Sequence, residues 1–325
     1  MAYKVLLTHR IPTEGMDLPE GDFHITTPEE KHFSTGELHR MIPDCDALIP
    51  VFGFPIDRSL IEKGDKLKII ANFGVGFNNI DVAAATEKGI MVTNTPKTVI
   101  EPTAELTFSL LLAVTRRIAE LDHKLKNKEP VKWEVMANLG HTLEGKTLGI
   151  IGMGNIGKSF ALKARAFGMN ILYYTRSRLS LTDEKTYGAR YTELDELIRS
   201  SDVVSLHTPL TEDTHHLLDD EAFRKMKQGT FIINTARGAV IHEEALIRHL
   251  QNGHLGGAGL DVFEFEPQIS EGLLGLDNVV VVPHIGTANY ETRKAMGEEA
   301  AINVAEYFKG TRPPNLVNPE TIENR

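Results

Sequence analysis

Short apolar runs alternate with amphipathic segments over the first 95 residues. The runs KVLLT, ALIPV, KIIANF and IMVTN occupy residues 4–8, 47–51, 68–73 and 90–94. Runs this short and this apolar predict buried strands of a parallel sheet. Between the first two runs, Ser34 and Glu37 have the spacing of a capping box, which predicts the start of a helix. The N-terminal part is therefore predicted to be a domain of alternating strands and helices.

A long apolar segment follows this domain. Glu101 and Pro102 predict the start of a helix, because proline is favoured in a first helical turn, and the pattern continues to about Leu121. Its apolar residues are Ala104, Leu106, Phe108, Leu110, Leu111 and Leu112. Since they cover nearly all sides of the helix, we expect it to be buried between domains or subunits.

A looser, more polar segment extends from Asp122 to Gly145. It carries Trp133, the only tryptophan of the chain. Two interpretations stay open at this point. Trp133 packs locally, or the segment is an arm that reaches a partner chain.

A second alternation of strands and helices begins at Thr147. Its predicted strands occupy residues 147–151, 171–174, 203–207, 230–235, 257–261 and 279–284. The last predicted helix, about residues 289–309, ends at Gly310 and is expected to return to the N-terminal domain, because chain ends often lie close together. The predicted domains are therefore residues 1–100 with 288–325, and residues 101–287, which include a linker helix and arm at 101–146.

The segment from Thr147 to Phe167 combines a strand, a glycine turn and a helix. Gly152, Gly154 and Gly157 have the G-x-G-x-x-G spacing of dinucleotide-binding folds. The first glycine permits a tight turn, the second lets a pyrophosphate approach the backbone, and the third lets helix and strand pack closely. The phosphates would lie at the helix N-terminus, which favours anions. Other glycine-rich turns share this spacing, but the order of elements favours a dinucleotide.

Composition narrows the possible partners. The 325 residues suit two domains, and a formal net charge of -10 argues against nucleic acid or an anionic membrane as the main partner. Cys45 is the only cysteine, which excludes a disulfide framework and a cysteine zinc site, and we expect no metal. The longest apolar stretch, residues 106–114, is too short to span a bilayer, and no signal peptide is visible. We expect a soluble cytoplasmic protein.

Charged side chains follow three predicted strands of the second domain. Arg237 follows one strand, Glu266 lies five residues beyond the end of the next, and His284 follows the last. Each has a plainer interpretation: a surface ion pair, a solvated turn carboxylate and a capping histidine, respectively. Because the carboxyl ends of parallel strands share one edge of the sheet, we expect the three side chains to gather there. A cation, a proton donor and a carboxylate are what a nicotinamide dehydrogenase needs.

Six motifs along the chain resemble the D-isomer-specific 2-hydroxyacid dehydrogenases. They read GVGFNNIDV, PTAELTFSLLLAVTRR, LEGKTLGIIGMGNIG, NTARGAVIHEEAL, GLDVFEFEP and VVPHIG, in the family's order and over essentially the whole length. Within that family the chain is most similar to glyoxylate/hydroxypyruvate reductases. The resemblance implies the α/β class with two doubly wound parallel-sheet domains, a Rossmann cofactor domain being inserted into a flavodoxin-like substrate domain. It also implies a homodimer.

The resemblance also implies catalytic roles. Arg237 would bind the carboxylate and carbonyl of a 2-oxo acid through its guanidinium fork. His284 would give a proton to the carbonyl oxygen as hydride arrives. Glu266 would hydrogen-bond His284 and favour its protonated form.

Binding roles follow from the same resemblance. Backbone N–H groups of Val75 and Gly76 would bind the carboxylate from the other domain, so that the substrate lies in the cleft between domains. Asp261 would hold the nicotinamide carboxamide. The implied substrate-binding residues are Phe52, Gly53, Val75, Gly76 and Trp133. The implied cofactor-binding residues are Thr103, Gly152, Gly154, Asn155, Ile156, Gly157, Thr175, Arg176, Ser177, His207, Thr208, Pro209, Thr214, Thr235, Ala236, Asp261 and Gly286.

The segment after the second strand of the cofactor domain bears on cofactor choice. An NAD site carries an acidic residue there, which bonds the ribose 2′-OH. Thr175 takes that place, and Arg176, Ser177 and Arg178 follow. Hydroxyls and arginines would hold a 2′-phosphate, so we predict a preference for NADPH over NADH. Alternatively, the two arginines are solvated loop charges and the enzyme uses either cofactor.

The segment PVFGFPID bears on the substrate. It has no basic residue before Arg58, which disfavours a phosphorylated substrate. Phe52 and Phe54 favour a small 2-oxo acid such as glyoxylate or hydroxypyruvate, although they could also accept a bulkier apolar side chain. Alternatives from other classes are a cofactor-sensing, corepressor-like binding protein and a hydrolase or lyase that never releases its cofactor.

Overall fold

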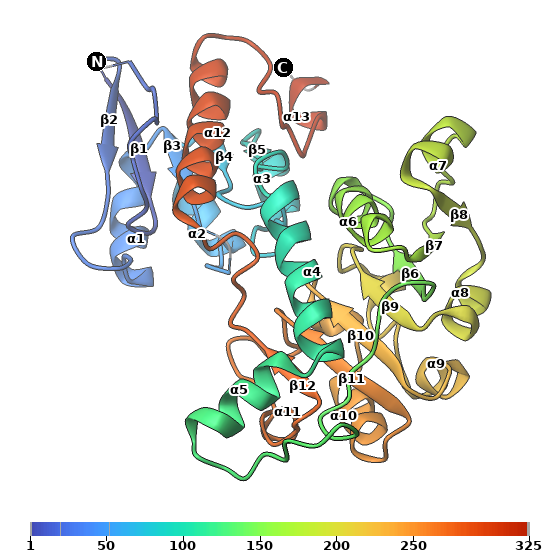
Figure 1. Ribbon diagram of the computed structural model, residues 1–325. Helices are drawn as coiled ribbons and strands as arrows, with labels where there is room; N and C mark the ends of the chain where they lie inside the picture. The colour runs from blue at the N-terminus through green and yellow to red at the C-terminus, as the bar shows by residue number, and fades with distance from the viewer. Residues whose placement is uncertain (1, 20, 52, 324–325) are drawn as a thin grey trace. The chain divides into compact units, whose positions relative to one another are not determined.

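The computed structural model describes residues 2–19, 21–51 and 53–323, and the chain divides into two compact units. Unit 1 contains residues 1–99 and 287–325, and unit 2 contains residues 100–286. The blue and the red elements in Figure 1 therefore belong to unit 1, and the green to orange elements belong to unit 2. Unit 2 is an insertion between the two segments that form unit 1.

Unit 1 is built on a parallel sheet in the order β2-β1-β3-β4-β5, which is the flavodoxin-like order. Its strands are β1 (Tyr3–Leu7), β2 (Phe23–Thr26), β3 (Ala47–Ile49), β4 (Ile69–Ala71) and β5 (Met91–Thr93). Its helices are α1 (Thr35–Met41), the 3₁₀ turn η1 (Ile42–Asp44), α2 (Arg58–Lys63), α3 (Val82–Glu87), α12 (Tyr290–Phe308) and α13 (Glu320–Glu323). The predicted capping box is present, because the Ser34 side chain accepts from Glu37 N–H and the Glu37 side chain accepts from Ser34 N–H.

Unit 2 is built on a second parallel sheet, in the order β12-β11-β10-β9-β6-β7-β8. Its strands are β6 (Thr147–Ile151), β7 (Asn170–Tyr174), β8 (Ala189–Tyr191), β9 (Val203–Leu206), β10 (Thr230–Asn234), β11 (Leu255–Leu260) and β12 (Val279–Val281). Its helices are α4 (Ile100–Thr115), α5 (Ile118–Lys126), α6 (Asn155–Ala166), α7 (Leu181–Tyr187), α8 (Leu194–Ser200), η2 (Glu212–Thr214), α9 (Asp220–Lys225), η3 (Gly238–Val240), α10 (Glu243–Gln251) and α11 (Glu271–Leu274). The strand order reverses between β6 and β9, so the switch point of a doubly wound fold lies there. The predicted α/β fold class is confirmed.

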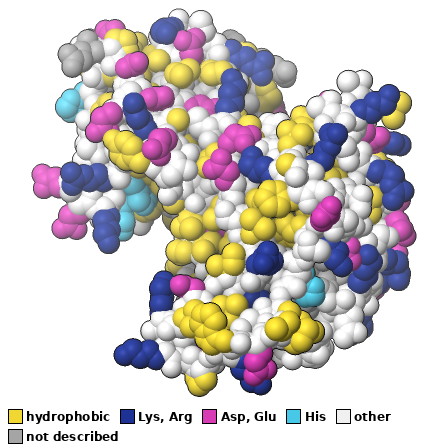
Figure 2. All heavy atoms as spheres, in the orientation of Figure 1, with side chains coloured by type: hydrophobic (Ala, Val, Ile, Leu, Met, Phe, Trp, Pro, Cys, Tyr) yellow, Lys and Arg dark blue, Asp and Glu magenta, His cyan; other side chains and the backbone are white. Residues whose placement is uncertain are grey.

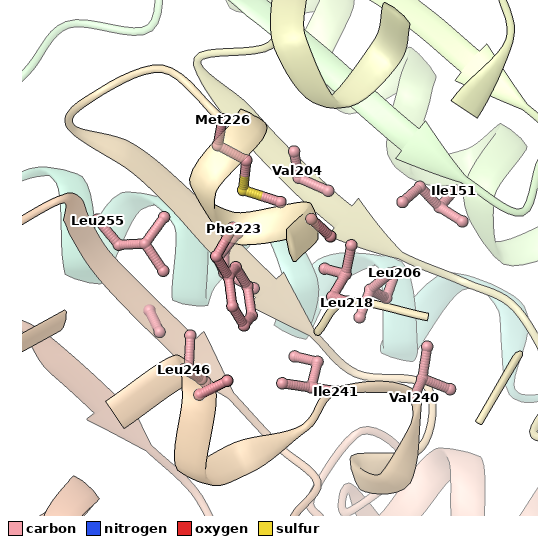
Figure 3. Close-up of a cluster of buried hydrophobic side chains, with 14 of the residues drawn as sticks. Ile151, Val204, Leu206, Leu218, Phe223, Met226, Val240, Ile241, Leu246 and Leu255 are labelled. Carbon is pink, nitrogen blue, oxygen red and sulfur yellow. The ribbon is translucent and has the colours of Figure 1, made fainter. Parts of the chain in front are cut away.

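Alternating strand residues bury both faces of the unit 2 sheet. Ile232 on β10 packs in a cluster with Phe223 from α9 and Leu246 from α10. Figure 3 shows Phe223 and Leu246 in this cluster. The neighbours of Ile232 on the strand, Phe231 and Ile233, point to the opposite face and join a cluster with residues of α4 and α6. Successive side chains of a strand alternate between the two faces of the sheet, so one apolar run contributes side chains to both hydrophobic clusters. This explains why these strands read as continuous apolar segments in the sequence.

The apolar segment after residue 100 forms two helices, and the prediction of one helix to Leu121 is wrong. Arg117 has φ 56°, in the left-handed region, and separates α4 from α5. α4 packs against α6, β10, β11 and β12, and its Glu101 and Glu105 are exposed, so α4 is buried along one side and not all round. None of the described helices is long and apolar enough to cross a membrane.

Candidate functional site

Each glycine of the fingerprint has its own steric surroundings. Gly152 has φ 97°, and a Cβ there would lie 2.6 Å from the carbonyl carbon of His207. A Cβ on Gly157 would lie 2.4 Å from the carbonyl oxygen of Gly152, so α6 can pack this close to the turn only without a side chain. At Gly154, by contrast, a Cβ would meet no described atom within 4 Å. Open space at the middle glycine is what the approach of a ligand requires.

The N-terminus of α6 fits a pyrophosphate. Gly154 is the N-cap and no side chain caps the helix, while the first backbone bond runs from Lys158 N–H to the Gly154 carbonyl. The N–H groups of Asn155, Ile156 and Gly157 therefore have no partner within the described part of the chain. Three free donors at the positive end of a helix dipole form an anion site. The residues present fit the phosphates of a dinucleotide.

The other predicted cofactor residues follow the C-terminal ends of neighbouring strands of unit 2. Thr175, Arg176 and Ser177 follow β7, His207, Thr208 and Pro209 follow β9, Thr235 and Ala236 follow β10, and Asp261 and Gly286 follow β11 and β12. Since all seven strands are parallel, these residues share one edge of the sheet. Thr103 lies on α4, and a Cβ on Gly286 would lie 3.5 Å from its side chain.

The segment after β9 is held by local hydrogen bonds. His207 Nε2 lies 2.9 Å from Ser205 Oγ, and burial lowers the pKa of His207 to about 3, so its ring is neutral at physiological pH. Thr214 Oγ1 donates to the carbonyl of Pro209 at 2.7 Å and closes the loop. The predicted residues His207, Pro209 and Thr214 thus form one ordered segment beside the glycine turn.

His284 and Glu266 form a hydrogen-bonded pair at the same edge. His284 Nδ1 lies 3.1 Å from Glu266 Oε2, and Glu266 Oε1 accepts from the N–H of Phe263 at 3.0 Å. Burial acts to raise the pKa of Glu266. The hydrogen bonds with His284 and Phe263 and the positive charge of Arg237 outweigh this effect, so the pKa of Glu266 is lowered. His284 has φ 52°, a backbone conformation that is costly for a side chain other than glycine and is often found at functional sites.

Arg237 lies between β10 and η3 and is half-buried. Its Nη1 donates to the carbonyl of Ala236 at 2.5 Å. Burial lowers the pKa of Arg237, while the carboxylate of Glu266 works in the opposite direction. An arginine stays charged under these conditions. The edge of the sheet therefore combines a fixed cation with the pair of Glu266 and His284.

Asp261 is buried directly after β11. Its carboxylate accepts from the N–H groups of Ile285 at 2.6 Å and Gly286 at 2.9 Å, and its carbonyl accepts from His284 N–H at 3.0 Å. Burial raises the pKa of Asp261 to about 6, although these hydrogen bonds oppose the rise. Asp261 thereby shapes the turn that carries His284.

Comparison with known proteins decides the family. The model of the D-isomer specific 2-hydroxyacid dehydrogenase NAD binding domain matches residues 108–286. The chain belongs to the D-isomer-specific 2-hydroxyacid dehydrogenases. It is 43% identical to a glyoxylate reductase of Thermococcus litoralis, over 99% of this chain and 98% of that one. A glyoxylate reductase of Korarchaeum cryptofilum is also 43% identical, over 100% of this chain and 98% of that one.

Solved structures agree with this assignment. The crystal structure of a glyoxylate reductase from Paecilomyes thermophila superimposes with a TM-score of 0.88 at 36% identity, covering 98% of this chain and 99% of that one. As a member of the D-2-hydroxyacid dehydrogenases, the protein is an NAD(P)-dependent oxidoreductase that interconverts 2-oxo and 2-hydroxy acids.

In this dehydrogenase, Glu243 and Glu264 connect the loop that carries Arg237 to the loop that carries Glu266. The sequence analysis did not single out either carboxylate. Glu243, which is buried, accepts from Glu264 N–H at 3.0 Å, and Glu264 accepts from Glu243 N–H at 2.9 Å. His216 Nε2 lies 2.6 Å from the second oxygen of Glu264. The motifs contain both glutamates, but their spacing along the chain gives no sign of this reciprocal pairing.

The two arginines after β7 differ in their surroundings. Arg178 forms a bidentate pair with Glu184, at 2.8 and 3.1 Å, and lies over the Tyr191 ring. Arg176 is exposed and has no hydrogen-bond or ion-pair partner among the described residues. Of the two, only Arg176 is free to meet a ligand.

The predicted substrate residues divide between the units. Gly53, Val75 and Gly76 lie on loops of unit 1, and Gly53 has φ 80°. Phe52 lies outside the described residues. Trp133 belongs to unit 2 and is 89% exposed, so the structure does not show the local packing that was one of its two interpretations.

Proposed function

We propose that this dehydrogenase reduces glyoxylate or hydroxypyruvate to the D-2-hydroxy acid, with Arg237, Glu266 and His284 as its catalytic group. The observation that supports this most is the hydrogen bond between His284 Nδ1 and Glu266 Oε2 at the sheet edge that also carries Arg237 and Asp261. The names of the relatives that are 43% identical support the choice of glyoxylate.

The roles follow from charge and geometry. The Arg237 guanidinium binds the 2-oxo acid through its carboxylate and carbonyl oxygens and orients the carbonyl carbon. Because Nδ1 of His284 is turned to Glu266, its Nε2 is the nitrogen that gives a proton to the carbonyl oxygen. The Glu266 carboxylate holds the ring in this orientation through its bond to Nδ1. The nicotinamide, when bound, supplies the hydride that reduces the carbonyl carbon.

A steady-state panel tests this function. Glyoxylate, hydroxypyruvate, pyruvate and a bulkier 2-oxo acid are each assayed with NADPH and with NADH, by loss of absorbance of the reduced nicotinamide. The proposal expects the highest kcat/KM for glyoxylate or hydroxypyruvate. A higher value for the bulkier acid would instead make the protein a dehydrogenase of larger substrates, and tight cofactor binding without turnover would favour the binding-protein alternative.

We propose NADPH as the preferred cofactor. The support is that Thr175 stands where an NAD site has an acid, and that exposed Arg176 has no partner among the described residues. A guanidinium that no carboxylate neutralises can bind a 2′-phosphate in a charge-assisted way. Arg178 is less available for this role, because it already forms a bidentate pair with Glu184.

The double variant Thr175→Asp with Arg176→Ala is expected to reverse the cofactor preference. The new carboxylate would repel the 2′-phosphate and accept from the 2′-OH of NADH, while the main phosphate contact is lost. We expect the ratio of kcat/KM for NADPH to that for NADH to fall by about 10²-fold, as the loss of one or two charge-assisted bonds implies. Arg178→Ala is the matched control and should leave the ratio nearly unchanged. If Arg178→Ala moves the ratio as much as the double variant, the assignment of Arg176 is wrong.

We also propose that the segment after α5 packs against a second copy of the chain. Trp133 is 89%, Val135 94% and Met136 76% exposed, and such a group of bare apolar side chains marks an interaction surface. Figure 2 shows hydrophobic side chains at the surface in the region where Figure 1 places α5 and the following segment. A homodimer would remove them from water.

Replacing Val135 and Met136 together by glutamate is expected to convert a dimer into monomers, because two charges would enter an apolar interface. Sedimentation velocity at micromolar protein measures the change. Leu181→Glu, at an exposed leucine on α7, is the control and should not dissociate the dimer. A monomeric wild-type protein, or an unchanged dimer in the double variant, would remove this proposal.

A further inference from the structure

Two asparagines hold the loop that contains Val75 and Gly76 by its carbonyl groups. The Asn72 amide donates to the carbonyl of Gly74 at 3.1 Å and to that of Gly76 at 2.8 Å. The Asn94 amide donates to the carbonyl of Val75 at 2.8 Å. Three successive carbonyls of the loop are thus bound by side chains from the ends of β4 and β5.

The planarity of the peptide bond fixes where the N–H groups of this loop point. In a trans peptide the C=O and the following N–H point in opposite directions. The N–H groups of Val75, Gly76 and Phe77 therefore point away from the carbonyls that the two asparagines bind. None of the three donates a hydrogen bond to the described part of the protein. Consecutive backbone donors that lack protein partners are available to bind an anion.

We propose that Asn72 and Asn94 are positioning residues that hold three backbone donors toward the substrate carboxylate, with the N–H of Phe77 as a third donor beside those of Val75 and Gly76. This rests on the proposed reduction of a 2-oxo acid. Neither asparagine touches the substrate itself. Each acts by fixing the direction of a peptide plane, so that the N–H groups need no reorientation when the anion binds.

The burial of the Asn72 side chain supports its role in fixing the loop. Its side chain is fully buried, and its Oδ1 has no hydrogen-bond partner among the described residues. An unpaired buried oxygen is unfavourable, and exchanging the amide nitrogen and oxygen would aim that oxygen at two carbonyls. The Asn72 amide is therefore fixed with its nitrogen toward Gly74 and Gly76, and its oxygen is left without a hydrogen bond to the described residues.

Asn94→Ala provides the cleanest test. The backbone of Asn94 stays in place, because its N–H donates to Asn315 and its carbonyl accepts from Asn303, so the variant removes only the amide. Asn170→Ala is the matched control, since the Asn170 amide makes the same kind of bond, to the carbonyl of Gly145 at 3.1 Å, away from the predicted substrate-binding residues. We expect Asn94→Ala to raise KM for glyoxylate about tenfold, as the loss of one buried hydrogen bond implies, with KM for NADPH unchanged and kcat changed less. A rise no larger than in Asn170→Ala would overturn the proposal.

A binding measurement separates this inference from the proposed function. Oxalate, a non-reacting dicarboxylate, is titrated while amide hydrogen exchange is followed in a peptide that covers residues 73–78. Slower exchange in the wild type and in Asn170→Ala, with the effect lost in Asn94→Ala, supports the positioning role even if glyoxylate is not reduced. Equal protection in Asn94→Ala, or none in the wild type, overturns the positioning role even if glyoxylate is reduced.

Discussion

Replacing His284 by alanine is expected to lower kcat for 2-oxo acid reduction by about 10²–10⁴-fold, which is the range of general acid catalysis by a positioned side chain. His284 lies 3.1 Å from Glu266 through Nδ1, and its N–H donates to the carbonyl of Asp261. The variant keeps the backbone but removes the proton donor. Since cofactor residues elsewhere on the sheet edge are untouched, cofactor binding should change little.

Rapid mixing with saturating glyoxylate and NADPH measures the step directly, and fluorescence titration measures the affinity for NADPH. His254→Ala is the control, because His254 is half-buried in the same unit and its ring is hydrogen-bonded, among the described residues, to the carbonyl of Phe223 alone. Turnover like that of the wild type in His284→Ala would refute the assignment of the proton donor. A matching loss of activity in His254→Ala would point to a loss of structure instead.

Replacing Arg237 by alanine is expected to lower kcat/KM by about 10²–10³-fold, as the removal of a donor that stabilises negative charge in a transition state does. Arg237 is half-buried, so a replacement water would offer less stabilisation than the guanidinium. Arg237→Lys should recover only part of the loss, because an ammonium is a point charge and lacks the bidentate fork.

The comparison of three variants makes this prediction specific. Arg224→Ala removes an exposed arginine that pairs with Asp220 on α9, and it should leave kcat/KM within twofold of the wild type. Full recovery in Arg237→Lys would mean that charge alone matters at this position. An unchanged kcat/KM in Arg237→Ala would refute its role in substrate binding.

The strands that consist of continuous apolar runs could be predicted, including the edge strands β5 and β12, but two more polar edge strands could not. The sequence predicts β6 at Thr147–Ile151, and the structure has the strand there. The sequence does not predict β2 or β8, which are edge strands in which only Ala189 of β8 is buried. An edge strand needs no continuous apolar run, since only part of it is buried. The break at Arg117 was also missed, because one left-handed residue interrupts α4 and α5 without altering the apolar pattern.

The site was predictable as far as it depends on strand ends. Parallel strands deliver Arg237, Asp261 and His284 to one edge once the strands are known, and this much follows from spacing. The reciprocal bonds between Glu243 and Glu264 depend on how two loops meet, which no local pattern encodes. The difference between Arg176 and Arg178 was equally hidden, because it depends on Glu184 from the following helix.

The interrupted sequence of unit 1 has a consequence for the order of folding during synthesis. α12 packs against β4, and Asn318 accepts from the N–H of Val92, so the N-terminal sheet is completed by residues that are made after unit 2. At about 5–20 residues per second, the ribosome takes about 10–40 s to make unit 2 before those residues emerge. Unit 2 is continuous in sequence and can fold first. Until α12 is made, strands β3 to β5 remain apolar segments that are incompletely covered. The newly made chain is therefore most prone to aggregate after the N-terminal part of unit 1 has emerged and before α12 is complete.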